Sequence, residues 1–241
     1  MIYYHYTSIE SFRAIVNSGK IWFGSLAFMN DRREGYAVRQ FLENALGEID
    51  SSEEMKAYKE LMEEAAKIYQ RYQYAFCAST LEDDLSQWRA YTELGHGLCI
   101  GFQAPFIGSE DVDSFSCIYS NEEKDAGIDE VFSEPEAVGE AEFRKLTELM
   151  AKFKAESFTS EKETRWVTRV SGLADLKAKR IRYRAHRLGL APYVEISVDL
   201  SQVVSVTLGP EVPGENKYSV DDFMIQSGCG GSVLTSKSSL R

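Results

Sequence analysis

Short runs of β-branched and aromatic residues recur along this chain, and their order constrains the fold more than any other feature of the sequence. Such runs are typical of strands. They occupy residues 2–4, 20–25, 74–79, 97–102, 114–120, 163–169, 192–200, 203–210 and 231–236. Because they do not alternate strictly with helical segments, the pattern favours an α+β fold with a mixed or mostly antiparallel sheet and flanking helices over a doubly wound sheet.

Apolar residues at helical spacing predict helices between these runs. The first helix follows "YHYTS" and ends at Gly19, a typical left-handed C-terminal cap. Further helices are predicted after a turn at Asp31 and Glu34, over 53–72, over 83–91, around 143–153 and from near 219, whereas 121–130 is predicted to be a loop. With no low-complexity linker in the sequence, we expect a single domain over residues 1–241.

Composition excludes several classes of protein. Hydrophobic residues make up 44% of the chain, which is typical of a folded domain, and no apolar run is long enough to span a bilayer. The net charge of −11 disfavours a general nucleic-acid-coating protein. Four scattered cysteines and three histidines without ligand spacing predict no metal site. We therefore expect a cytoplasmic protein with reduced thiols, no metal and no membrane contact.

Two motifs carry aromatic and hydrogen-bonding groups. His5 lies in "HYT" at a strand-to-helix junction, where it serves either as a functional group or as a satisfied structural group, with Tyr6 packing and Thr7 capping the helix. In "LSQWRAY", Trp88 and Tyr91 either pack a short helix or stack on a planar ring. We expect the strand at 2–5 to be central, and this second motif to line a cleft at its end.

Two further motifs carry charge. In "EKETRWV", Glu161 and Glu163 alternate toward the side of Arg165 if the segment is extended, which is typical of either a surface ion-pair ladder or a carboxylate site. "KAKRIRYRAHR", residues 177–187, places six cationic residues in an acidic chain. It is either a solvated connection or a site for phosphate, which arginine binds in a bidentate manner.

The motif set resembles an uncharacterised bacterial family of domains of unknown function. The resemblance rests on "YHYTS", "MND" followed by Glu34, "SQWRAY" with "GLCIGF" behind it, "EKETRW", "PYVEI" and "LGP", in this order over nearly the full chain. A more distant resemblance carries a reaction. A histidine followed by Tyr-Thr at the end of the first strand, then a helix ending in glycine and another strand, is similar to the opening of ADP-ribosyltransferase-fold enzymes.

That second resemblance implies NAD as a substrate and a role for each motif. It implies that Glu163 is the catalytic carboxylate, that Glu161 orients the acceptor, and that His5 holds a ribose hydroxyl with Tyr6 and Thr7 beside it. It further implies nicotinamide contacts from the helix at 85–91 and pyrophosphate contacts from the basic segment. The implied cofactor-binding residues of these two segments are Trp88, Arg89, Tyr91, Arg182 and Arg184.

Three functions remain open at this point. The first is an ADP-ribosyltransferase or NAD glycohydrolase that acts as a toxin or antiphage effector, with a protein or nucleic acid as acceptor. The second is a non-catalytic domain that senses a nucleotide or interacts with another protein. The third is a nuclease or other phosphate-processing enzyme that uses Asp31, Glu34 and the basic segment. Convergence of His5, Glu163 and an arginine on one pocket favours the first.

Overall fold

The fold is described from a computed structural model. The structure describes residues 1–29, 56, 60–61, 63–65, 67, 72–108, 111–131, 140–169, 181–186 and 189–239. Its strands are β1 (Ile2–Thr7), β2 (Lys20–Ser25), β3 (Gln73–Ser79), β4 (Leu98–Gln103), β5 (Val112–Ser116), β6 (Glu163–Arg169), β7 (Arg182–His186), β8 (Gly189–Ser197), β9 (Val203–Leu208) and β10 (Ser232–Thr235).

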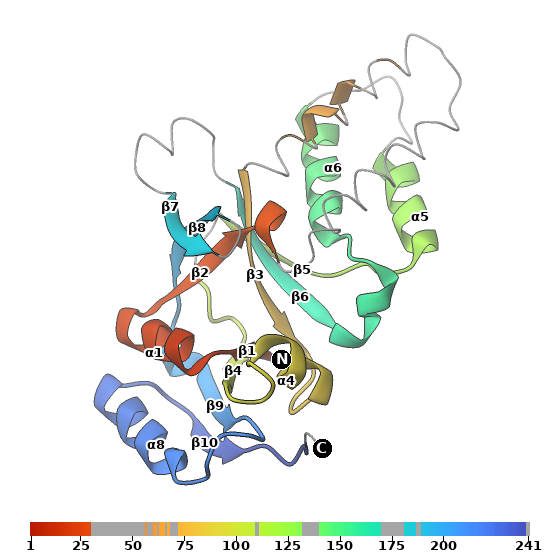
Figure 1. The fold of residues 1–241 in the computed structure, drawn as a ribbon. Helices are drawn as coiled ribbons and strands as arrows, with labels where there is room; N and C mark the ends of the chain where they lie inside the picture. Colours follow the sequence, from red (N-terminus) through yellow and green to blue (C-terminus); the bar gives the residue numbers. More distant parts are fainter. Residues whose placement is uncertain are drawn as a thin grey trace.

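The strands form one open sheet in the order β10-β9-β4-β1-β3-β2-β8-β7, and β6 pairs with β3 and β5 in addition. Only the β9–β10 pair is parallel among these described strands. The α+β class and the mostly antiparallel sheet are therefore confirmed. The central position of β1 is confirmed as well, because β1 lies between β4 and β3 (Figure 1).

Helices flank this sheet. They are α1 (Ile9–Ser18), α4 (Leu85–Tyr91), α5 (Asn121–Val131), α6 (Glu140–Lys152) and α8 (Asn216–Ser227), with short 3-10 helices η1 (Leu26–Phe28), η3 (Glu156–Glu161) and η4 (Leu200–Gln202). Figure 1 shows α5 and α6 beside β5 and β6, and α1 and α8 near β9 and β10 at the other end. Gly19 ends α1 with φ of 61°, as predicted, and Ser8 caps its start through the Ser11 N–H.

Two segments differ from the prediction. The loop predicted over 121–130 is wrong, because α5 begins there with Ser120 as its cap: Ser120 Oγ accepts from the Glu123 N–H and donates to the Glu123 carboxylate. The second difference is β7, which forms within the basic segment and pairs with β8 at the edge of the sheet. Alternating arginines at an edge strand hide the apolar signal on which strand prediction depends.

The sheet has apolar cores on both faces. Phe76 and Trp166 belong to one core, and the adjacent Ala75 and Val167 belong to the other, which contains Leu146 of α6. Adjacent residues of a strand point to opposite faces. β3 and β6 therefore carry both cores at once and form the structural centre of the molecule.

Candidate functional site

The sheet opens between β1 and β2. β6 pairs with β3 along its whole length, from Gln73 to Ser79. Since a strand has only two edges, β1 and β2 share the other one: β2 pairs at Tyr74 and Ala75, and β1 pairs at Ser79. Between these contacts the two strands diverge, and Phe76, Cys77 and Ala78 line the opening.

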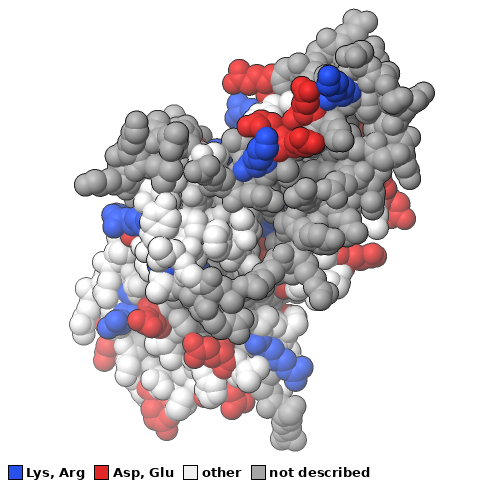
Figure 2. Space-filling view, turned by 45° about the horizontal axis from the view of Figure 1, so that its top comes forward, with Lys and Arg blue, Asp and Glu red and all other residues white. Residues whose placement is uncertain are grey.

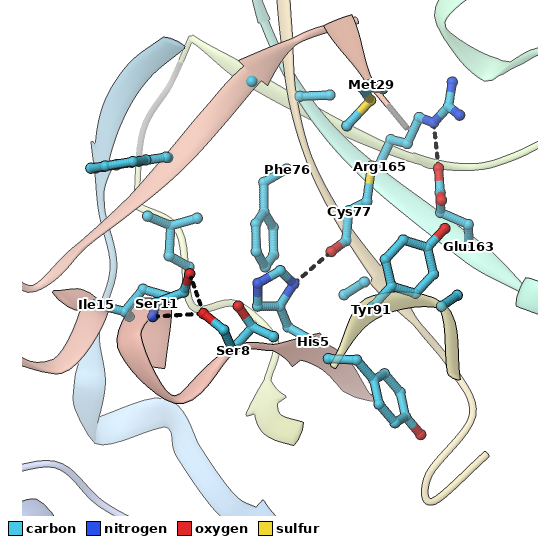
Figure 3. Close-up of a pocket in the computed structure, with 18 of the residues that line it drawn as sticks. His5, Ser8, Ser11, Ile15, Met29, Phe76, Cys77, Tyr91, Glu163 and Arg165 are labelled. Carbon is cyan, nitrogen blue, oxygen red and sulfur yellow. Dashed lines mark hydrogen bonds and ion pairs between the residues drawn. The ribbon is translucent and has the colours of Figure 1, made fainter. Parts of the chain in front are cut away.

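A pocket of about 1000 Å³ occupies this opening (Figure 3). Its described lining brings together predicted site residues from five elements. They are His5, Tyr6 and Thr7 from β1, Tyr91 from α4, Glu161 from η3, Glu163 from β6 and Arg184 from β7. The pocket therefore joins His5, Glu163 and an arginine, which is the convergence that the sequence analysis set as its criterion.

His5 lies partly buried on the wall of the pocket. Its Nδ1 is 2.9 Å from the Cys77 carbonyl oxygen, which faces the opening, and its ring packs against Phe76 at 4.5 Å between centroids. Burial lowers the pKa of His5 to about 4, and the bond to Cys77 offsets this only in part. At neutral pH the ring is uncharged, and since a carbonyl only accepts, Nδ1 carries the proton. Nε2 is left as an acceptor.

The two glutamates belong to a buried ion-pair network. Lys154 Nζ lies 2.5 Å from both Glu161 Oε2 and Glu163 Oε2, and Arg165 Nε lies 2.5 Å from Glu163 Oε1. The Tyr91 hydroxyl donates to Glu161 Oε1 at 2.8 Å. Two carboxylates and two cations balance, so the network lines the pocket without a net charge.

The charge state of Glu163 follows from this network. Burial alone raises the pKa of a carboxyl group, but the charges and hydrogen bonds of Arg165 and Lys154 outweigh burial and hold the pKa of Glu163 at about 2. Glu163 is thus ionised at neutral pH. The Tyr119 hydroxyl accepts from its backbone N–H at 2.8 Å, which fixes the first residue of β6.

Other residues of the first motif serve the framework. The Tyr6 hydroxyl donates to the Leu81 carbonyl at 2.8 Å and accepts from the Asp84 N–H at 2.9 Å, so it positions the loop before α4. Thr7 is buried at the end of β1. The helix cap expected at Thr7 is formed by Ser8 instead.

Trp88 and Arg89 do not contribute to the pocket in this structure. Trp88 is fully buried, its Nε1 donates to Asp83 Oδ1 at 2.8 Å, and its ring packs edge-on against Tyr6. A side chain without an accessible face cannot stack on a ligand, so the stacking role expected for Trp88 is wrong. Arg89 points to solvent on the exposed side of α4 and is not among the lining residues. From "SQWRAY", Gln87, Ala90 and Tyr91 line the pocket.

The basic segment divides in a similar way. Arg182 Nε binds Glu195 Oε2 at 3.2 Å and does not line the pocket, whereas Arg184 does. Residues 177–180 and 187 lie outside the described residues, as do Asp31 and Glu34 of the nuclease hypothesis. Among the described residues there is no cluster of three metal-ligating side chains. A search of the same residues finds no helix with the length and hydropathy to cross a bilayer.

The sequence analysis missed several residues of the site. Lys154 stands alone after α6 in "AKFKAES", with no periodicity to mark it, and only the tertiary fold brings it to both glutamates. Cys77 lines the pocket as well, although nothing in its apolar strand pattern distinguishes it from a core residue. Trp22 was one of the apolar residues of a predicted strand. Trp22 occupies every second position of β2 together with Lys20 and Gly24, and this was the available signal that it lies on the face opposite to the buried Ile21 and Phe23.

Comparison with curated proteins and with solved structures gives no significant match. A family model described as "Protein of unknown function (DUF2971)" matches residues 87–166, which confirms the predicted resemblance to an uncharacterised family over this part of the chain. The matched part includes Tyr91, Lys154, Glu161, Glu163 and Arg165. The complete buried network of the pocket therefore lies within the segment similar to DUF2971.

Proposed function

We propose that the protein binds NAD in this pocket and cleaves its nicotinamide–ribose bond, as an NAD glycohydrolase or ADP-ribosyltransferase. The observation that carries the proposal is the convergence of His5, Glu163 and Arg184 on one pocket, in the opening between two central strands. These residues are distant in sequence, and each has the chemistry that one part of a dinucleotide requires.

The reaction needs a stabilised positive charge and no redox step. The bond between the ribose C1′ and the nicotinamide nitrogen breaks, and nicotinamide leaves with the electron pair. Water or an acceptor nucleophile then bonds to C1′ and loses a proton. In the glycohydrolase case the products are ADP-ribose, nicotinamide and a proton. Because the transition state resembles an oxocarbenium ion, an ionised carboxylate close to the ribose stabilises it.

The pocket residues fit distinct parts of this task. Glu163, ionised and held by Lys154 and Arg165, faces the ribose and accepts from its 2′-hydroxyl. His5 accepts a hydrogen bond from a ribose hydroxyl at Nε2, because Nδ1 already donates to the Cys77 carbonyl oxygen. Glu161 lies beside Glu163 and orients water or the acceptor. The Arg184 guanidinium binds the phosphates. Fixed partners hold His5, Glu161 and Glu163 in place before the ligand arrives.

One observation favours a second candidate, a domain that binds the nucleotide without cleaving it. Both carboxylate oxygens of Glu163 already contact cations, Oε1 with Arg165 and Oε2 with Lys154. These positive charges offset part of the field that would stabilise an oxocarbenium ion. In this second candidate the same residues recognise ribose hydroxyls, and NAD is bound and released intact.

Nicotinamide release from NAD distinguishes the two candidates. We expect the purified protein to release nicotinamide, and Glu163→Gln to lower the rate by about a hundredfold to a thousandfold while NAD binding persists. Glu161→Gln should change transfer to an acceptor more than it changes hydrolysis. Glu148→Gln, at a surface ion pair of α6, serves as the matched control and should retain full activity.

The folded state has to be controlled in this experiment, because Glu163→Gln leaves Arg165 and Lys154 short of a buried partner. Glu163→Asp keeps the charge but withdraws the carboxylate by one methylene group, and it should also lose most of the turnover. NAD binding without nicotinamide release by the wild type would establish the binding domain. Full turnover by Glu163→Gln, with its fold intact, would exclude the proposed catalytic role.

A further inference from the structure

One face of the sheet at the mouth of the pocket carries an exposed indole and three cationic side chains. We call it the β2–β8–β7 face and define it by Lys20, Trp22, Tyr193, Glu195, Arg182 and Arg184. The pairing register places these residues on the same side: Gly24 lies opposite Tyr193, Trp22 opposite Glu195, and Arg182 opposite Tyr193. Since side chains alternate along a strand, Trp22 and Arg184 share this side with Tyr193.

Trp22 presents a large ring to the pocket. It lines the pocket and is 45% exposed, whereas its neighbours Ile21 and Phe23 are buried in the core. Tyr193 stacks on one face of the indole, with 4.2 Å between ring centroids and 28° between the ring planes. This contact fixes the orientation of the indole, so a ligand ring can stack without first ordering the side chain.

Of the three cationic side chains that define this face, Arg184 is the one available to a ligand. Glu195 binds both Lys20, at 3.3 Å, and Arg182, at 3.2 Å, so these two cations already have a carboxylate partner. Arg184 is exposed, lines the pocket and forms no ion pair among the described residues. On the face of the protein shown in Figure 2, acidic and basic side chains are interspersed. An arginine in the pocket lining that has no ion pair with any described residue therefore marks a local site for an anion in this acidic chain.

A base joined to phosphates can span the distance between Trp22 and Arg184. Tyr193 lies diagonally between them, on the strand that separates theirs, because Trp22 is opposite Glu195 and Arg184 is opposite Ala191. Two strand spacings and four residue rises along β8 together amount to about 16 Å between the backbones, and both side chains are long enough to shorten this gap. Neither side chain would recognise ribose alone, because an indole stacks on planar rings and a guanidinium pairs with phosphate oxygens.

We propose that the β2–β8–β7 face binds the adenylate half of the ligand, with Trp22 stacked on the base and Arg184 on the phosphate. This inference rests on the proposed function for its orientation: the nicotinamide riboside half lies deeper, at His5 and Glu163, and the adenylate half lies at the mouth. In this assignment the stacking residue is Trp22 and not Trp88. Trp22 stacks on the adenine base, whereas the contact expected for Trp88 was with the nicotinamide.

Binding of separate halves of NAD tests the assignment. Titration calorimetry with AMP, adenosine, nicotinamide mononucleotide and NAD is carried out on the wild type and on Trp22→Leu, which keeps an apolar side chain but has no planar face. Trp22→Leu should weaken AMP, adenosine and NAD by roughly tenfold to a hundredfold and leave nicotinamide mononucleotide unchanged. Trp22→Phe should restore most of the affinity. Arg184→Ala should weaken AMP but not adenosine.

Two control variants match these substitutions. Tyr183→Ala removes an aromatic ring that is 54% exposed on the same strand as Arg184 but points to the opposite face. Arg89→Ala removes an exposed arginine outside the pocket lining. Both should bind AMP as the wild type does, and thermal unfolding of every variant shows whether it is folded.

The outcomes separate this inference from the proposed function. Wild-type protein that binds AMP in a Trp22-dependent manner but releases no nicotinamide supports the face and refutes NAD cleavage. Nicotinamide release that is unaffected by Trp22→Leu and Arg184→Ala, with NAD affinity unchanged, overturns the inference and keeps the proposed function. Binding of neither AMP nor NAD by the wild type overturns both. Equal weakening of nicotinamide mononucleotide and AMP by Trp22→Leu also overturns it, since the indole then does not discriminate between the halves.

Discussion

His5 shows how one side chain at a strand end can serve both structure and recognition. Its position in "HYT" was predictable from the strand-to-helix transition, but its tautomer was not, because Cys77 lies on another strand. The same holds for Glu163: alternation predicted that it shares a side with Arg165, whereas Lys154 joins them only in the folded chain. Sequence analysis finds residue types and local spacing, and it does not find partners that tertiary contacts supply.

The first prediction concerns the pH dependence of stability. Burial lowers the pKa of His5 in the folded state to about 4 from 6.5, so the unfolded chain takes up a proton at a higher pH. The contribution of neutral His5 to the free energy of unfolding is complete above pH 6.5. It is lost as the pH falls toward 4, and the loss is on the order of 3 kcal/mol. Urea unfolding of the wild type and His5→Gln over this range measures it. The wild type should lose more free energy of unfolding than His5→Gln; parallel curves would contradict the burial of this ring.

The second prediction concerns Lys154, whose side chain is 5% exposed between two carboxylates. Lys154→Met leaves Glu161 and Glu163 buried with too little positive charge and should lower the free energy of unfolding by about 3–5 kcal/mol. Lys152→Met is the matched control. Its ammonium pairs with Glu148 at the surface, where such a pair contributes less than about 1 kcal/mol.

The charge origin of this effect has its own test. Lys154 helps to lower the pKa of Glu163, so in Lys154→Met this carboxyl group takes up a proton more readily as the pH falls, and the penalty of the substitution should shrink. Denaturant unfolding of wild type and variant at neutral and acidic pH provides the comparison. A penalty that stays constant with pH would mean that the lysine contributes through packing of its aliphatic stem.

At the scale of elements, strands with apolar runs were predictable and charged or capped elements were less so. β1, β2, β3, β4, β6, β8, β9 and β10 occur where the β-branched and aromatic runs predicted strands. β7 was missed because its arginines alternate at an edge. α5 was missed because its apolar residues form no clear stripe at helical spacing, so only the Ser120 cap marks its start. The split of the sheet is a property of pairing between distant strands, and no local pattern encodes it.

The third prediction concerns the contact between the end of β1 and the start of β4. A Cβ at Gly97 would lie 2.2 Å from the Thr7 carbonyl oxygen, a backbone atom that cannot move without displacing β1. Gly97→Ala should therefore cost about 1–3 kcal/mol of unfolding free energy. Gly108→Ala meets nothing within 4 Å and should change stability by less than about 0.5 kcal/mol. Equal stability of the two variants in chemical denaturation would place β4 further from Thr7.

At the scale of the whole molecule, the arrangement of two cores determines how the protein unfolds. The core beneath α6 contains Leu146, and the core on the opposite face contains Leu208 of β9. β3 and β6 supply residues to both, with Phe76 and Trp166 on one face and Ala75 and Val167 on the other. Loss of either core removes packing that holds β3 and β6 in place. Because the other core depends on the pairing of these same strands, it is destabilised as well.

The fourth prediction is that the chain unfolds in a single cooperative transition, because the two cores share β3 and β6. Leu146→Ala and Leu208→Ala each remove a fully buried side chain and should lower the same transition by about 2–5 kcal/mol. Leu190→Ala, at a residue that is 67% exposed, is the matched control and should have little effect. Far-UV circular dichroism and tryptophan fluorescence should give coincident curves. Two transitions, with Leu146→Ala shifting only one, would mean that the layer of α5 and α6 unfolds independently of the strands that carry the pocket.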